Sequence, residues 1–288
     1  MATIRNPIEW GADQISRASL HIRTAGRTLG GAETASSSAQ PEVRRIEVAD
    51  LGEVLRKGFD DFGAYRTDVA FLCLIYPVIG LFLARAAFDY DLVPLLFPVA
   101  SGFALLGPVA AIGLYEMSRR REQGLETSWR DAFGMIGAPA FGAIAVLGLA
   151  LLMVFLGWIA AAQVIYMSTL GPEPPASVMG FLSDVFTTDA GLAMMVVGIS
   201  VGFLFALLVL ATSVVSFPML LDRDVGLGTA VTTSVRVVLA NPVAMAAWGV
   251  IVATGLVFGS LPLFLGLVVV MPVLGHATWH LYRKVVVQ

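Results

Sequence analysis

The stretch VPLLFPVASGFALLGPVAAIGLYEMSRRR, residues 93–121, decides the fold class of this protein. It has no charged residue before Glu116, and it ends in three consecutive arginines. An apolar run of this length crosses the ~30 Å hydrocarbon core of a bilayer as one helix. Arginines at the end of such a helix stay on the cytoplasmic side of the membrane. We therefore predict a membrane span here, with its last turn at the cytoplasmic surface.

The rest of the 288-residue chain has the same character. Apolar residues make up 57% of the sequence and charged residues only 14%, with a mean hydropathy of +0.82. This composition is too apolar for a soluble domain of ordinary make-up. We therefore expect an all-α, polytopic membrane protein with six transmembrane helices. The spans are expected at residues 68–88, 93–116, 139–166, 191–221, 242–259 and 261–282.

Positive charge is divided unequally between the two sides of this bundle. If residues 1–66 share one side with the connections after the second, fourth and sixth spans, that side holds 17 of the 18 Lys and Arg residues. The exception, Arg85, lies four residues before Asp89, so a helical ion pair is its simplest account. Because positive residues are retained in the cytoplasm, both termini are expected there. The long connection over residues 169–188 is then an outer loop.

A threefold internal repeat is the second strong pattern in the sequence. A short segment with apolar or small residues at i, i+3, i+4, i+7, i+8 and i+11 precedes each odd-numbered span, and this spacing places one stripe along a helix. We expect three pseudo-repeated hairpins of spans, each preceded by an amphipathic helix at the cytoplasmic interface. The stripes, each followed by an alanine and a break, are Leu51, Val54, Leu55, Gly58, Phe59 and Phe62 before Ala64; Leu125, Ser128, Trp129, Ala132, Phe133 and Ile136 before Ala138; and Leu227, Ala230, Val231, Ser234, Val235 and Val238 before Ala240.

Two sets of positions make this repeat testable. Equivalent stripe residues are expected to be buried against the spans or inserted at headgroup depth, namely Leu55, Trp129 and Val231. Prolines inside the even-numbered spans are expected to kink them, because proline lacks an amide hydrogen and clashes with the preceding turn. These prolines are Pro108, Pro218 and Pro272.

The chain divides at about residue 50. Residues 1–49 are expected to form a flexible cytoplasmic arm, in which Ile8, Ile15 and Ile22 favour either a lipid-bound amphipathic helix or disorder. Residues 50–288 form the six-span domain. No apolar segment precedes residue 67, so the first span is expected to act as its own insertion signal. The single cysteine, Cys73, excludes an intrachain disulfide.

Four polar residues near the inner ends of the even-numbered spans are candidates for a cluster at the inner mouth: Glu116, Asp222, His276 and His280. The two histidines lie four residues apart on one face of the sixth span. Such imidazoles can ligate a metal or haem, but a structural site needs about four ligands, and His21 is the only other histidine. We therefore predict no metal and no cofactor, with His276 and His280 as weak candidates. The alternative places them in an aromatic belt at the headgroups.

Glu116 has two interpretations. In a transport protein it would share a water-accessible vestibule with His280. In a structural role it would pair with Arg119 or Arg120, three and four residues later on the same helix, and we favour this pair. The basic residues at the span ends are interpreted as topology anchors and contacts for lipid headgroups; they are Arg119, Arg120, Arg121, Arg223, Arg283 and Lys284.

Four runs carry a family resemblance: residues 107–122 (GPVAAIGLYEMSRRRE), 215–224 (VSFPMLLDRD), 240–242 (ANP) and 275–284 (GHATWHLYRK). Through them, about residues 41–287 resemble a family of predicted bacterial integral membrane proteins, catalogued as domain of unknown function 2189. The resemblance implies a bacterial inner-membrane protein, but no established activity, ligand or catalytic residue. Some members are labelled cytochrome c oxidase subunit I, which is far longer and needs more metal-ligating histidines than the three present here.

The functional prediction is correspondingly broad. Phosphate-loop, zinc-protease and nucleophile-elbow motifs are missing from the sequence, so we expect no enzyme. The spans lack central charges, which opposes an energised pump, and a net charge of −3 opposes a nucleic-acid partner. We favour a pathway for a small solute or ion. The alternative is a non-catalytic binding or assembly partner in the membrane, for example of a respiratory complex; the expected partners are the lipid bilayer and either a homo-oligomer or such a complex.

Overall fold

The computed structural model describes residues 40–74, 78, 80–82, 85, 93–128, 131–132, 139–173, 175 and 177–287, with the backbone alone at residues 66–73 and 103. Residues 1–39 of the predicted arm, nine residues of the first span, and Trp129, Phe133, Ile136 and Ala138 of the second amphipathic segment lie outside these residues. The described chain is helical apart from turns, connections and an antiparallel bridge between Val43 and Val286. Its helices are α2 (Asp50–Cys73), η1 (Val93–Leu95), α4 (Leu96–Phe103), η2 (Ala104–Leu106), α5 (Gly107–Ala110), α6 (Ile112–Glu122), α7 (Phe141–Thr169), α8 (Val178–Thr187), α9 (Asp189–Ser213), α10 (Ser216–Asp222), α11 (Leu227–Ala240), α12 (Pro242–Ser260) and α13 (Leu267–Val285).

Four helical stretches among the described residues are long and apolar enough to cross a membrane. They are residues 93–122, α7, residues 189–222 and α12. They overlap the second, third, fourth and fifth predicted spans and confirm a polytopic membrane protein. The first predicted span is described only in part, and α2 ends within it at Cys73. The sixth contains α13, which begins only at Leu267 and is not among the four, so the number six stays a prediction.

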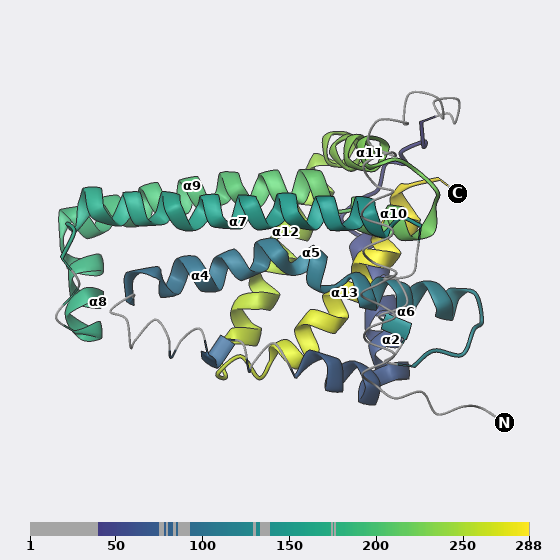
Figure 1. Ribbon diagram of the computed structural model, residues 1–288, viewed down its shortest axis with the longest axis horizontal. Coiled ribbons are helices and arrows are strands. Elements are labelled where there is room, and N and C mark those ends of the chain that lie inside the picture. Colours follow the sequence, from purple (N-terminus) through teal and green to yellow (C-terminus); the bar gives the residue numbers. More distant parts are fainter. Residues whose placement is uncertain are drawn as a thin grey trace.

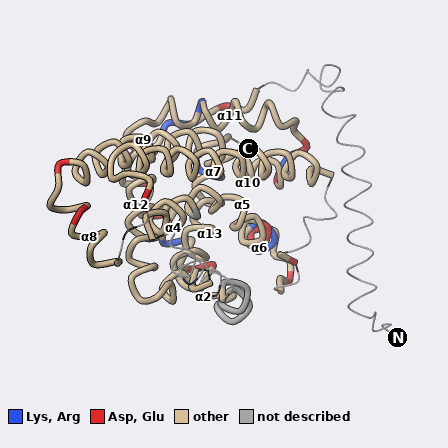
Figure 2. Tube along the Cα trace, turned by 60° about the vertical axis from the view of Figure 1, so that its left-hand side comes forward, with Lys and Arg blue, Asp and Glu red and all other residues tan. Residues whose placement is uncertain are grey.

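The molecule has two distinct ends (Figure 1). At one end α7 and α9 form the tip of a long hairpin, with α8 lying across it. At the other end α2, α6, α10, α11 and the last turns of α13 gather. We call this the basic end, because it holds the arginines that close α6 and the Arg–Lys pair of α13. The opposite end, at the tip of the α7–α9 hairpin, carries acidic residues on α8 and at the start of α9 (Figure 2). We call it the distal end.

Two of the three internal prolines interrupt their spans as predicted. Before Pro108 the chain changes to the 3-10 turn η2, which starts at Ala104, four residues earlier. Before Pro218 the break between α9 and α10 lies at Val214 and Val215. In both cases the proline cannot donate to the carbonyl four residues before it. Pro272 lies inside α13, which continues through it as one helix.

The two described amphipathic helices end where the repeat predicts. In α2 the backbone leaves helical geometry at Tyr65 (φ −118°, ψ 20°), directly after Ala64. In α11 the helix stops at Ala240, and Asn241 (φ −131°, ψ 50°) turns the chain into α12. Leu55 and Val231 are partly buried and pack against the hydrophobic core. These two residues therefore lie as expected, whereas the third of the set, Trp129, is not described.

One member of the first stripe was placed on the wrong face. Phe59 is 56% exposed, whereas Val54, Gly58 and Asp61 are buried. The buried face of α2 is therefore rotated from the predicted stripe toward Asp61, which lies seven residues after Val54 and so two turns further on the same side. A charged residue thus replaces an apolar one in the contact with α13.

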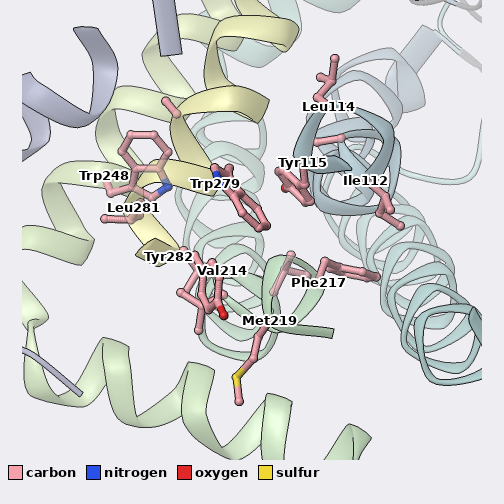
Figure 3. Packing of buried hydrophobic residues seen from close by; sticks show 14 of the residues in the cluster. Ile112, Leu114, Tyr115, Val214, Phe217, Met219, Trp248, Trp279, Leu281 and Tyr282 are labelled. Atoms are coloured by element: carbon pink, nitrogen blue, oxygen red, sulfur yellow. The ribbon is translucent and has the colours of Figure 1, made fainter. Parts of the chain in front are cut away.

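The core of the basic end is dry and aromatic. Tyr115 of α6, Phe217 and Met219 of α10, and Trp279 and Tyr282 of α13 are all buried and lie in the same region (Figure 3). They belong to one hydrophobic cluster that continues to Trp248 on α12. Burial of these large side chains stabilises the association of α6, α10, α12 and α13.

Candidate functional site

Asp61 is the centre of a buried polar cluster between α2, α6 and α13. Only 5% of this residue is exposed. Its Oδ2 accepts hydrogen bonds from Ser118 Oγ at 2.6 Å and His280 Nε2 at 2.9 Å, and its Oδ1 accepts one from Arg121 Nη1 at 2.6 Å. Burial alone would raise the pKa of this carboxyl, but the hydrogen bonds from His280 and Ser118 outweigh it and hold the pKa below its usual 3.8. Asp61 is therefore an ionised acceptor with its partners in place.

His276 extends the cluster into the protein interior. Ser118 uses its only hydroxyl hydrogen toward Asp61, so His276 Nδ1, at 2.8 Å, must be the donor to Ser118 Oγ. The ring is then the neutral Nδ1–H tautomer. Its Nε2 is fully buried and has no hydrogen-bond partner within the described part of the chain. The chain of contacts therefore runs from the Asp61 carboxylate, which lines the cavity, to a buried nitrogen that still has a free lone pair.

A glycine makes this cluster possible. A Cβ on Gly58 would lie 2.7 Å from the Val273 carbonyl oxygen and 2.8 Å from Ala277 Cβ. Only a residue without a side chain lets the α2 backbone come this close to α13. Asp61, one turn later on α2, is thereby brought against His280, one turn later on α13. The small residues at Gly58 and Ala277 thus set the distance between the polar groups.

A cavity of about 550 Å³ opens over this cluster at the basic end. Asp61, Ser118 and His280 line it together with charged residues of α2, α6 and α13. The remaining lining residues are Arg44, Glu53, Val54, Lys57, Asp60, Arg121, Glu122, Arg283 and Lys284. The volume is within the range of small-molecule sites, although its lining is far more polar than usual.

Ion pairs hold the rim of this cavity. Lys284 Nζ contacts both Asp50 and Glu53, and Lys57 Nζ contacts Glu53 at 2.9 Å. Hydrogen bonds from Lys284 and Lys57 lower the pKa of Glu53 to about 2, and the hydrogen bonds to Glu53 and Asp50 raise the pKa of Lys284. Because these groups are solvent-exposed, they stabilise little and mainly position the start of α2 against the end of α13.

Glu116 forms the local ion pairs that we favoured in the sequence. Its carboxylate accepts hydrogen bonds from Arg119 Nε at 2.9 Å and Arg120 Nε at 3.2 Å, and Arg120 also pairs with Asp131. No hydrogen bond or ion pair among the described residues joins Glu116 to either histidine. The carboxylate that the histidines meet is instead Asp61. Glu116 and the two histidines of the predicted inner-mouth cluster therefore belong to separate groups.

Asp222 belongs to a third group, which ties α10 to α13. Its Oδ2 accepts from Tyr282 Oη at 2.7 Å and pairs with Arg283 Nη1 at 3.3 Å. Arg283 also pairs with Glu122 at 2.8 Å, and Trp279 Nε1 donates to that same carboxylate. Of the predicted anchors, Arg119, Arg120, Arg121, Arg223, Arg283 and Lys284 all have a protein partner. These cations therefore connect the helices of the basic end through ion pairs, in addition to giving this end its positive charge.

The residues that sequence reasoning missed are Asp61, Ser118 and Glu122. Asp61 carried a usable signal, because it lies seven residues, or two turns, after the buried Val54 on the same face of α2. Ser118 and Glu122 carried none, since one polar residue at the end of a span resembles any other. Among the residues the structure describes, no group of three or more His, Cys, Asp or Glu side chains is arranged to hold a metal ion.

Comparison with known proteins supports the membrane class. Residues 96–222 match the model of the family described as "Predicted integral membrane protein (DUF2189)", which confirms the resemblance seen in the sequence. The matched segment contains Ser118 and Arg121 but not Asp61 or the two histidines. No curated protein and no solved structure matches the chain.

Proposed function

We propose that this chain, whose residues 96–222 match a family of integral membrane proteins, is a membrane-embedded binding protein that works through the cavity at its basic end. One contrast carries the proposal. The polar groups gather around a cavity at the surface, over Asp61, Ser118 and His280. The neighbouring interior is filled by buried side chains, Tyr115, Phe217, Met219, Trp279 and Tyr282. A solute path along the axis would need polar groups where these aromatic residues lie, so we favour binding over transport.

The hydrogen-bond donors and acceptors that line the cavity indicate the class of ligand that it binds. Each carboxylate in the cavity already contacts a cation: Glu53, Asp60, Asp61 and Glu122. The cations retain unused donors, since Lys57 has three and contacts one carboxylate. Arg44 has no carboxylate partner among the described residues. A small anion rich in acceptor oxygens, such as a phosphate or a polycarboxylate, fits this surplus.

We place the basic end in the cytoplasm of a bacterial cell and both termini with it, in an inner-membrane protein with six spans. The division of positive charge supports this orientation. The distal end, which carries Glu173, Asp184 and Asp189 and belongs to a stretch without Lys or Arg (residues 131–222), has the charge pattern of an outer side under this rule. In this orientation the cavity opens to the cytoplasm and meets its metabolites or the acidic groups of a neighbouring protein complex.

A pseudo-threefold repeat accounts for the way the amphipathic segments pack against the span ends at the basic end. The i+7 residues of the first two stripes, Gly58 and Ala132, contact Ala277 and Gly113, which each lie six residues before a span-ending arginine. The i+7 residue of the third, Ser234, accepts a hydrogen bond from the backbone between α9 and α10. α11 thus packs on the span before it, Ala132 contacts Gly113 of α6, and α2 packs on α13, the last helix. Such a ring supports three repeats around one axis.

The test is anion binding in lipid nanodiscs by isothermal titration calorimetry, with inorganic phosphate and citrate as probes. We expect saturable binding of at least one probe, weakened at least about tenfold in the double variant Arg44→Gln, Lys57→Gln, because two direct donors are lost. Arg56→Gln is the matched control, since Arg56 lies on the same helix and pairs with Asp60 but does not line the cavity.

Two results would overturn this function. The first is no binding of either probe, or equal weakening in the Arg56→Gln control, which would leave the cavity without a role. The second is protein-dependent flux of a probe into liposomes that is abolished by a substitution of Tyr115 or Phe217, which would restore the transport hypothesis.

A further inference from the structure

We infer that α8 is an interfacial helix that lies on the membrane leaflet at the distal end, with lipid covering its exposed apolar face. The sequence predicted an outer loop over residues 169–188, and the structure has a helix in its second half. α8 lies across the tip of the α7–α9 hairpin, so it runs along the membrane surface if that hairpin spans the membrane (Figure 1). This inference concerns the end opposite the cavity and is independent of the proposed binding function.

Helix length places α8 at headgroup depth. α7 has 29 residues and starts directly after the turn at Pro139 and Ala140. At 1.5 Å per residue it is about 43 Å long, well beyond the ~30 Å hydrocarbon core but equal to the ~40–45 Å of a bilayer with both headgroup layers. If α7 begins in one headgroup layer, it therefore ends in the other. α8 begins after eight further residues, and its contact with Tyr166 in the last turns of α7 places it at that depth.

Contacts fix α8 rigidly against the hairpin tip. Tyr166 of α7 donates to the Glu173 carbonyl at 2.6 Å and meets the Phe181 ring edge-on at 6.3 Å. A Cβ on Gly191 of α9 would lie 2.1 Å from the Asp184 carbonyl oxygen, so only glycine allows this approach. Ser177 caps the start of α8 by accepting from Gly180 N at 3.0 Å. The orientation of each face of α8 is thus determined.

α8 has three faces, and one of them is apolar and exposed. Phe181 packs beside Tyr166, and Val185 is buried against α9. A second face carries Asp184 and other polar or small residues, Gly180, Ser183 and Thr187. On the third face Met179 is 75% and Phe186 64% exposed. Val178 and Leu182 complete this third face. A fixed helix with one such apolar face needs an apolar cover.

Lipid is the occupant that the surroundings indicate. Exposed apolar residues continue from α8 along the hairpin, with Val164 and Met167 on α7 and Leu192 and Val196 on α9. These flanks belong to helices apolar enough to span a membrane, so the surface of α8 joins a surface already assigned to lipid. No Lys or Arg occurs between residues 131 and 222. Contact with the leaflet therefore rests on apolar insertion and should not depend on anionic lipid.

The experiment reads the depth of single residues in nanodiscs. In a Cys73→Ala background, Met179→Cys is labelled with a polarity-sensitive fluorophore, and Asp184→Cys, on the polar face of the same helix, is the matched control. We expect blue-shifted emission at position 179, at least about threefold stronger quenching by brominated lipid than at position 184, and weaker quenching by aqueous iodide. The difference should be the same in zwitterionic lipid and in mixtures with anionic lipid.

Each other outcome overturns the inference. Equal iodide quenching at positions 179 and 184 would place α8 in water. Protection from both quenchers, with disulfide-linked dimers of unlabelled Met179→Cys, would mean that a second copy of the chain covers this face. A requirement for anionic lipid would replace apolar insertion by electrostatic attraction. Leu182→Cys, on the same apolar face, repeats the measurement if Met179→Cys does not yield a monodisperse protein.

Discussion

In both the α2–α13 junction and the α10–α11 junction, a short helix places a stripe of small residues against the end of a membrane helix. At the first junction Gly58 touches Ala277, and Asp61 lies one turn further along α2. At the second, Ser216 Oγ donates to the Ala230 carbonyl at 3.2 Å, and Val237 holds the position that corresponds to Asp61. Val237 is fully buried. One junction therefore carries a buried carboxylate where the other carries a methyl-bearing side chain.

This difference separates packing from function. The α10–α11 junction shows that small residues and apolar burial suffice to hold such a helix in place. The Asp61 cluster is then an addition, and a costly one, because a buried ion pair must offset the desolvation of its charges. Costly polar groups beside a cavity are typical of sites under functional constraint. The comparison therefore points to the α2–α13 junction as the working part of the basic end.

The largest effect is expected when a carboxylate is introduced at the α10–α11 junction. Val237→Asp would bury a carboxylate among apolar neighbours at a cost of about 4 kcal/mol, and we expect loss of monodisperse protein in size-exclusion chromatography. Thr232→Asp adds the same charge at an exposed position of α11 and should be tolerated. Equal behaviour of the two variants would show that the second junction is open to water and is not the apolar counterpart described above.

Replacing the carboxylate of the α2–α13 junction by an apolar side chain should destabilise the protein less. Asp61→Val leaves Arg121, His280 and Ser118 without their shared acceptor, but Arg121 is partly exposed and can turn to water. We expect a loss of about 2–3 kcal/mol in stability, measured as a lower midpoint of thermal unfolding in detergent. Asp60→Val, on the exposed side of α2, should change little. An Asp61→Val protein as stable as the unmodified chain would mean that the cluster adds nothing to the junction.

A third test concerns the close approach of the helices. Gly58→Ala should destabilise by about 2 kcal/mol, because the new Cβ meets backbone and cannot be accommodated without moving α2. Gly52→Ala, on the same helix with nothing within 4 Å of its Cβ, should stabilise by about 0.5–1 kcal/mol through helix propensity. Thermal unfolding of both variants measures the difference. The same sign for both would contradict the packing described for α2 and α13.

Acid should produce the smallest of these effects. The folded pKa of Asp61 lies below its usual 3.8, so its stabilisation is complete above about pH 4 and is lost as the pH falls through the folded pKa. Glu53, with its pKa at about 2, acts in the same direction. Unfolding midpoints measured at about pH 6 and about pH 3 should differ more in the unmodified protein than in Asp61→Val. An identical pH dependence in both would show that Asp61 is not ionised in the fold.

The pattern of small and apolar residues anticipated the breaks after Ala64 and Ala240, because a stripe of one period describes one helix and ends where that helix ends. It could not anticipate that Phe59 is exposed and Asp61 buried. The helical period defines the buried face of α2 only to within about one residue. The contact with α13 then decides which of the neighbouring residues are buried. Similarly, Glu116 was predicted to pair locally, because its partners are three and four residues away on the same helix.

The sequence by itself determined that this is a polytopic membrane protein, since apolar length and low charge act segment by segment and need no partner. It also determined the division of positive charge and the local Glu116 pairs. Only the tertiary structure decided that the histidines meet Asp61, that Asp222 binds Tyr282, and that α8 lies across the distal tip. The histidine and Asp222 contacts join residues at least 60 positions apart in the chain, and the α8 contacts join three separate elements. Their geometry depends on which glycines let two backbones approach, and no local pattern encodes that choice of partner.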